Sequence, residues 1–132
     1  MDPKAKALQE RTHRFFVDVI KYTRTVPACK ESDEIVPQLL ASAGSADSNY
    51  RACCKARSKK EFIAKVGVAA EEADESLGWL TALRDAELGD ATQVGKLIQE
   101  SDELTSIFVK SGATAARNLA AAEAKHKARR RR

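Results

Sequence analysis

Apolar residues recur every three or four positions along most of the chain, which is the spacing of an α-helix. The first such stripe covers about residues 4–25, and Pro27 marks its end. A second stripe runs from Leu39 to Cys53 and contains mainly small side chains, which permit close helix packing. No segment shows the strict alternation of a half-buried strand. The pattern therefore predicts a chain made of helices.

Capping residues divide the pattern into further helices. Ser32 or Asp33 can cap the second helix, which places Pro37 in its first turn, where a missing N–H is tolerated. The run 58–61 (Ser-Lys-Lys-Glu) is a capping box that starts a third helix, expected to continue to about residue 87. Gly89 then ends that helix and Asp90 caps a fourth, which continues towards residue 122.

Four helices joined by short polar connections predict an all-α fold, an antiparallel up-down-up-down four-helix bundle. We expect residues 1–124 to form this bundle and residues 125–132 to be a disordered polybasic tail. Gly112 is unfavourable inside the fourth helix and marks either a kink or the end of the packed bundle.

The formal net charge is +4, but the basic residues are unevenly distributed. The last eight residues hold six basic and no acidic side chains, so residues 1–124, with 17 basic and 19 acidic groups, carry −2. A second basic group of net +5 lies within residues 51–65, beside Tyr50. These two elements are the candidate nucleic-acid-binding residues: Arg51, Lys55, Arg57, Lys59, Lys60, Lys65, Arg129, Arg130, Arg131 and Arg132. A solvated bundle end and a solubilising tail are the alternative interpretations.

Residues 71–103 have the opposite character, with ten acidic residues against two basic ones, a net charge of −8. A solvated acidic surface, a docking surface for a basic partner and a metal site are the alternatives, and the absence of a nearby histidine disfavours metal. No catalytic residue is predicted, because the chain's two histidines, His13 and His126, lie in no catalytic motif. His13 is expected to be an ordinary surface or partly packed residue. Scattered glycines form no phosphate-binding loop, so we expect no enzyme activity, no cofactor and no metal.

The chain lacks an apolar run long enough to cross a bilayer, and its first residues lack a signal-peptide core. The three cysteines, Cys29, Cys53 and Cys54, are expected to be free thiols. These features predict a cytoplasmic protein without membrane contact.

Trp79 is out of phase with the apolar stripe of the third helix. Since tryptophan is enriched at interface hot spots, we expect it at a subunit interface, with simple core packing as the alternative.

Several blocks of the sequence resemble a known family. The pair Ser48-Asn49, followed after a short spacer by residues 57–63 (Arg-Ser-Lys-Lys-Glu-Phe-Ile), resembles a signature of the bacterial four-helix bundle proteins. These are also called ribosomal-intervening-sequence proteins, because some are encoded within insertions in large-subunit rRNA genes. Residues 23–27 and 86–89 extend the resemblance. It departs at residues 51–53 (Arg-Ala-Cys) and at Glu71-Glu72.

The resemblance implies a four-helix fold, a homopentameric ring and no enzyme activity. Some relatives with this fold serve retroelements, where a basic pentamer binds nucleic acid and a reverse transcriptase. Residues and resemblance together predict a non-enzymatic, self-associating bundle that binds nucleic acid through the basic helix junction and the C-terminal arm, with RNA as the expected nucleic acid. The alternative is a protein-interaction scaffold that docks a basic protein on its acidic third helix.

Overall fold

The computed structural model describes residues 1–132 and contains four helices and no strands. The helices are α1 (Pro3–Thr23), α2 (Lys30–Cys53), α3 (Lys59–Asp85) and α4 (Ala91–Arg130). The predicted all-α class and the number of helices are confirmed.

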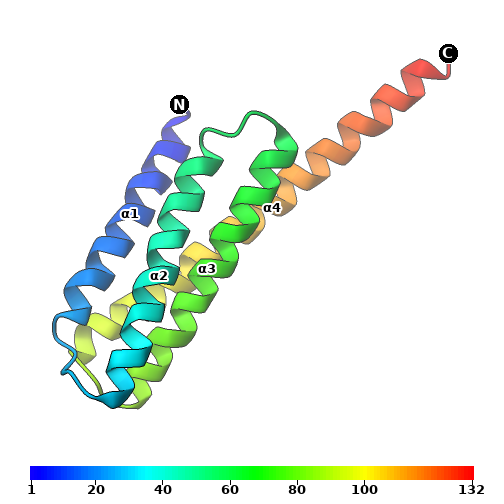
Figure 1. Cartoon of the computed structure of the whole chain (residues 1–132). Coiled ribbons are helices and arrows are strands. Elements are labelled where there is room, and N and C mark those ends of the chain that lie inside the picture. Colours follow the sequence, from blue (N-terminus) through cyan, green and yellow to red (C-terminus); the bar gives the residue numbers. More distant parts are fainter.

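The chain turns back after each helix, so that consecutive helices lie side by side (Figure 1). α2 packs between α1 and α3, and α4 packs against α3 and also contacts α1. The N-terminus, the α2–α3 connection and the exit of α4 lie at one end of the molecule, which we call the junction end (Figure 1). At the opposite end, the Tyr22 hydroxyl on the last turn of α1 donates to the Leu88 carbonyl at 2.7 Å. The Asp90 amide donates to the Thr25 hydroxyl at 2.9 Å, so the α1–α2 and α3–α4 connections are joined.

The core consists of 18 buried apolar residues contributed by all four helices. α2 and α3 contribute all five buried alanines of the core, and larger side chains from all four helices fill the remaining space. Tyr50 and Phe108 stack near the junction end with ring centroids 5.1 Å apart, which is a favourable aromatic contact. A buried hydrogen bond between the Ser42 and Ser76 hydroxyls, 2.8 Å long, satisfies the polar groups between α2 and α3.

The predicted caps hold at α3 and α4 and differ at α2. Ser58 Oγ accepts from the Glu61 amide at 3.1 Å, and the Asp90 carboxylate accepts from the Gln93 amide at 2.8 Å. At α2 the helix begins at Lys30 with Cys29 as its N-cap, because the Ser32 hydroxyl accepts from the Cys29 amide at 2.9 Å. The prediction that Pro37 lies in the first turn is wrong, since it is the eighth residue of α2. Pro37 is exposed there, so water can satisfy the backbone carbonyl that it leaves unpaired.

The expected disordered tail is also corrected, because α4 continues without interruption to Arg130, past the expected boundary at residue 124. Residues 113–128 contain eight alanines, the best helix former, and lengthening an existing helix avoids the unfavourable nucleation step. The basic residues of the last turn also interact favourably with the negative end of the helix dipole. Gly112 lies within this helix, and a Cβ added to it would lie 3.2 Å from Val66 Cγ1, so it permits close contact between α4 and α3.

Candidate nucleic-acid interface

The predicted basic residues of segment 51–65 surround the connection between α2 and α3. Arg51 is on the last turn of α2, and Lys65 is on the second turn of α3. Between them, the chain leaves one helix and enters the next in five residues, so the charges cannot separate. All six are exposed except Lys65, which is half-buried. The structure therefore brings this predicted group together in one region, which we call the basic junction: Arg51, Lys55, Arg57, Lys59, Lys60 and Lys65.

Only the two arginines of the basic junction are engaged in ion pairs. Arg51 Nη2 donates to Asp47 Oδ2 at 3.2 Å, and Arg57 Nε lies 3.7 Å from Glu61 Oε2. The four lysines of the junction have no acidic partner within 4.0 Å. The positive charge of these four lysines is therefore left uncompensated within the chain.

An apolar cavity of about 690 Å³ opens beside the basic junction. Met1 and Ala5 at the start of the chain line it together with Tyr50 and Phe62. Arg57 and Lys59 also belong to its lining. A cavity of this size with cations beside aromatic rings suits a planar ring attached to an anionic group.

The second predicted group lies on the projecting end of α4. Every residue from Ala120 onward is exposed, so residues 120–130 form a free helix about 16 Å long. We call residues 120–132 the basic arm. It projects from the junction end (Figure 1). Its cations have no acidic partner within 4.0 Å: Lys125, Lys127, Arg129, Arg130, Arg131 and Arg132. The two basic elements, separated by some 60 residues of sequence, thus share one end of the molecule.

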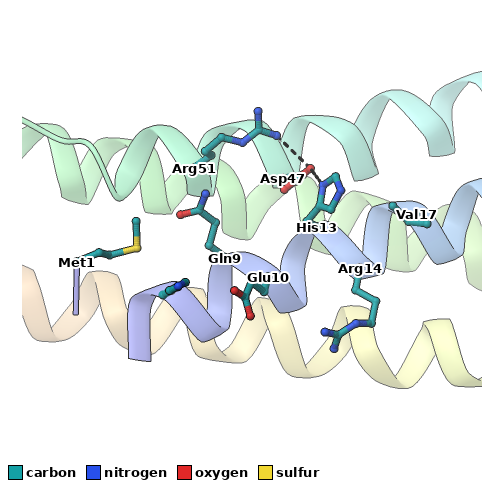
Figure 2. A pocket seen from close by; sticks show the side chains of 9 residues that line it. Met1, Gln9, Glu10, His13, Arg14, Val17, Asp47 and Arg51 are labelled. Atoms are coloured by element: carbon teal, nitrogen blue, oxygen red, sulfur yellow. Dashed lines mark hydrogen bonds and ion pairs between the residues drawn. The ribbon is translucent and has the colours of Figure 1, made fainter. Parts of the chain in front are cut away.

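A polar groove that sequence reasoning missed runs between α1 and α2, with a volume of about 850 Å³ (Figure 2). At its centre is Asp47, whose side chain is only 3% exposed. Asp47 Oδ2 lies 2.9 Å from His13 Nδ1 and also accepts from Arg51 Nη2 at 3.2 Å. Lys6 and Arg14 add two further cations to the lining, and Glu10 adds one anion.

His13 is a surface residue, as expected, with 62% of its side chain exposed. Its contact with a buried carboxylate was not predicted. The spacing of Asp47 and Arg51, four residues apart on one helix, is a signal for their ion pair. No sequence signal links His13 to Asp47, because they are 34 residues apart and meet only when α1 packs on α2.

Two acceptor oxygens of this groove are buried without a hydrogen-bond partner, Asp47 Oδ1 and Gln9 Oε1. A buried acceptor without a donor is unfavourable, and a bound water, ion or ligand is one way in which it is satisfied. Both belong to residues that line the groove.

The predicted acidic surface is present on α3. Glu71, Asp74 and Glu75 are exposed and have no basic partner within 4.0 Å. Burial, and then the negative charge of Glu75, raise the pKa of the neighbouring Glu72 above its usual value. On α4 the acidic character is reduced, because Glu100 forms two hydrogen bonds with Arg11 of α1.

Trp79 is half-buried and packs against the hydrophobic core. It also lines a surface cavity of about 620 Å³ with Ile35, Pro37 and other residues from the start of α2. Its indole Nε1 is buried without a hydrogen-bond partner.

The cysteines, possible metal ligands and helix hydropathy complete the description of the site. All three cysteines are free, and burial raises the pKa of Cys53 to about 12, so its thiol stays protonated at neutral pH. No cluster of three His, Cys, Asp or Glu side chains is arranged to hold a metal ion. None of the four helices is both long and apolar enough to cross a membrane.

Residues 5–110 match the family described as 23S rRNA-intervening sequence protein. The chain belongs to this family. The family match contains the basic junction and every lining residue of the polar groove except Met1, and it ends before the basic arm. The resemblance noted in the sequence is confirmed.

A solved structure from Bacteroides thetaiotaomicron, described as a protein with unknown function from the S23 ribosomal protein family, has a similar fold. The TM-score is 0.71 at 23% sequence identity, and the match covers 78% of this chain and 95% of the other. No curated protein matches the sequence significantly.

Proposed function

We propose that this member of the intervening-sequence family is a self-associating, non-enzymatic bundle that binds RNA through the basic junction and the basic arm. The observation that carries the proposal is their shared position. Two cation groups far apart in sequence lie at the same end of the bundle, and ten of their cations lack an acidic partner, namely four junction lysines and six arm residues. Cations without internal partners are free to neutralise phosphates.

The apolar cavity beside the junction supports RNA rather than a simple polyanion. Single-stranded RNA presents unstacked bases, which proteins hold in apolar sites lined with aromatic rings while cations contact the backbone. Phe62 and Ala5 supply the apolar lining here, and Arg57 and Lys59 are the adjacent cations. We also infer a cytoplasmic location, which the three unpaired cysteines favour.

The test is a binding titration with a fluorescent 20-nucleotide single-stranded RNA at 50 mM salt. The double variant Lys59→Glu and Lys60→Glu is expected to weaken binding at least tenfold, because it reverses two exposed charges at the junction. The matched control, Lys21→Glu with Arg24→Glu, makes the same charge change on exposed residues at the opposite end of the bundle and is expected to weaken binding much less. Equal losses in both variants, or no loss in either, would reject the proposed interface.

A protein-interaction scaffold is the second candidate, and the exposed, unpaired carboxylates of Glu71, Asp74 and Glu75 favour it. In this case a basic protein partner would dock on α3. A pull-down before and after nuclease treatment separates the two functions, because a protein bound directly stays after nuclease whereas an RNA-bridged one is released. Substitution of the three carboxylates by amides would abolish the capture of a directly bound partner only.

Self-association is part of the proposal, and Trp79 is the residue that we place at the interface. Its half-buried ring beside an open cavity, with a buried indole N–H lacking an acceptor, supports an additional contact there. A homopentamer, as the family resemblance implies, would present five junctions and five arms, so weak single contacts would combine. Analytical ultracentrifugation of Trp79→Ala tests this: a smaller assembly is expected, and an unchanged mass and stability would exclude Trp79 from the interface.

A further inference from the structure

We infer that the polar groove between α1 and α2 is the ribose-reading part of the RNA site, in which His13 Nε2 contacts a 2′-hydroxyl beside a phosphate held by Arg51. This inference rests on the proposed RNA-binding function and extends it to the discrimination of RNA from DNA.

The chemical state of His13 follows from its partner. An ionised carboxylate only accepts hydrogen bonds, so Nδ1 of His13, 2.9 Å from Asp47 Oδ2, must carry the proton. In the neutral ring, Nε2 then has a free lone pair, because the two nitrogens cannot both be protonated. The side chain is 62% exposed, and His13 lines the groove, so this acceptor is available to a ligand.

Asp47 makes the arrangement rigid. Its side chain is 97% buried, and one oxygen, Oδ2, binds both His13 and Arg51 (Figure 2). A buried carboxylate that orients an exposed imidazole sets its tautomer and direction, which a mobile surface histidine lacks. Asp47 is therefore a positioning residue, and His13 and Arg51 are the groups that meet the ligand.

The lining of the groove fits a ribonucleotide unit. The lining carries three cations, Lys6, Arg14 and Arg51, against the two carboxylates of Glu10 and Asp47, so its net charge of +1 attracts an anion. The volume of about 850 Å³ suits a nucleotide. In RNA a 2′-hydroxyl lies next to every 3′-phosphate, and it is the group that distinguishes RNA from DNA for a protein. A hydroxyl donates to a free imidazole nitrogen, whereas a DNA strand offers nothing at this position.

The groove also continues into the proposed RNA site. Arg51 belongs both to the basic junction and to the groove, and Met1 lines both the groove and the apolar cavity. One strand can thus extend from the junction lysines, past the cavity, to His13.

The first experiment compares a 20-nucleotide RNA with its 2′-deoxy counterpart of the same base sequence. The native protein is expected to prefer RNA, and His13→Ala should lower RNA affinity about 3- to 10-fold with DNA affinity unchanged, the effect of one hydrogen bond. Asp47→Asn should reduce the same RNA-to-DNA ratio. Lys59→Glu with Lys60→Glu should weaken both ligands alike, because it removes phosphate contacts only.

The possible outcomes are distinct. If the lysine variant loses binding while His13→Ala leaves the ratio unchanged, the groove inference fails and the proposed function stands. If His13→Ala weakens RNA and DNA equally, His13 contacts phosphate and does not read the ribose. If the native protein shows no preference, the inference is overturned.

A second readout does not depend on the junction. The two histidines give separate imidazole NMR signals, and His126 in the arm serves as an internal control. Titration with uridine 3′-monophosphate should shift the His13 signal much more than titration with 2′-deoxyuridine 3′-monophosphate, with His126 responding equally to both. Equal responses at His13, or none, would overturn the inference even if the protein bound no long RNA.

Discussion

The basic arm offers a quantitative test of the RNA-binding proposal, because its arginines contribute charge and no packing. Arg129 to Arg132 are fully outside the bundle, and α4 ends among them. Replacing all four by glutamine removes four charges and keeps side chains of similar helix propensity. Each phosphate neutralised on a single strand contributes about 0.7 to the slope of log K against log salt. The slope should therefore decrease by up to about 2.8.

This change corresponds to a large difference in measurable affinity. Between 50 and 200 mM salt, the native complex should weaken by up to about 50-fold more than the variant complex. Fluorescence anisotropy at four or more salt concentrations gives both slopes, and urea unfolding followed by circular dichroism gives the stability. Stability should stay within about 0.5 kcal/mol, because exposed substitutions away from packed groups have small effects. An unchanged salt slope would show that the arm does not contact RNA. A large loss of stability would show that the arm's arginines pack against the bundle.

Three further predictions concern the bundle itself. Gly95→Ala should stabilise the protein by about 0.8–1 kcal/mol in urea unfolding, because a Cβ there meets nothing within 4 Å and alanine is the better helix former; a loss of stability would contradict this. Gly89→Ala should destabilise the protein by at least about 1–2 kcal/mol, because its φ of +81° is unfavourable for alanine and the new Cβ would lie 2.8 Å from a methyl group of Val26. A urea unfolding midpoint equal to that of the native protein would show that the turn adapts to alanine. Glu72→Gln should raise the melting temperature at pH 7 and leave it unchanged at pH 3. The raised pKa of Glu72 means that the folded state favours the protonated form, so stability is lost as the pH rises through that pKa. Glu71→Gln, at an exposed position, removes the same charge and is the control. An equal rise in melting temperature for that variant would exclude burial of Glu72 as the cause.

Local signals in the sequence were enough to predict most of the fold. Ser58 and Asp90 cap their helices as their side chains suggest, because an N-cap depends only on residues within one turn. Pro37 shows the limit of this reasoning. The helix starts earlier than expected because Cys29, a residue with no strong capping preference, shares a hydrogen-bonded turn with Ser32.

The candidate site was only partly predictable for the same reason. Charges close together in sequence, such as Lys59 and Lys60, stay together in any helical fold. The basic arm leaves from the junction end because α4 runs toward that end. That direction follows from the number of helices that precede α4, since each helix reverses the direction of the one before. The contact between His13 and Asp47 depends on which faces of α1 and α2 pack together, and a stripe of apolar residues does not determine that rotation closely enough.

The helical state of the basic arm has a consequence for how tightly it can hold a partner. A disordered segment loses conformational entropy when it binds, about 1–2 kcal/mol for the backbone of each residue that becomes fixed. In α4 the residues up to Arg130 are already ordered before any partner arrives. The arm therefore keeps more of its interaction energy as affinity than a flexible tail of the same composition would.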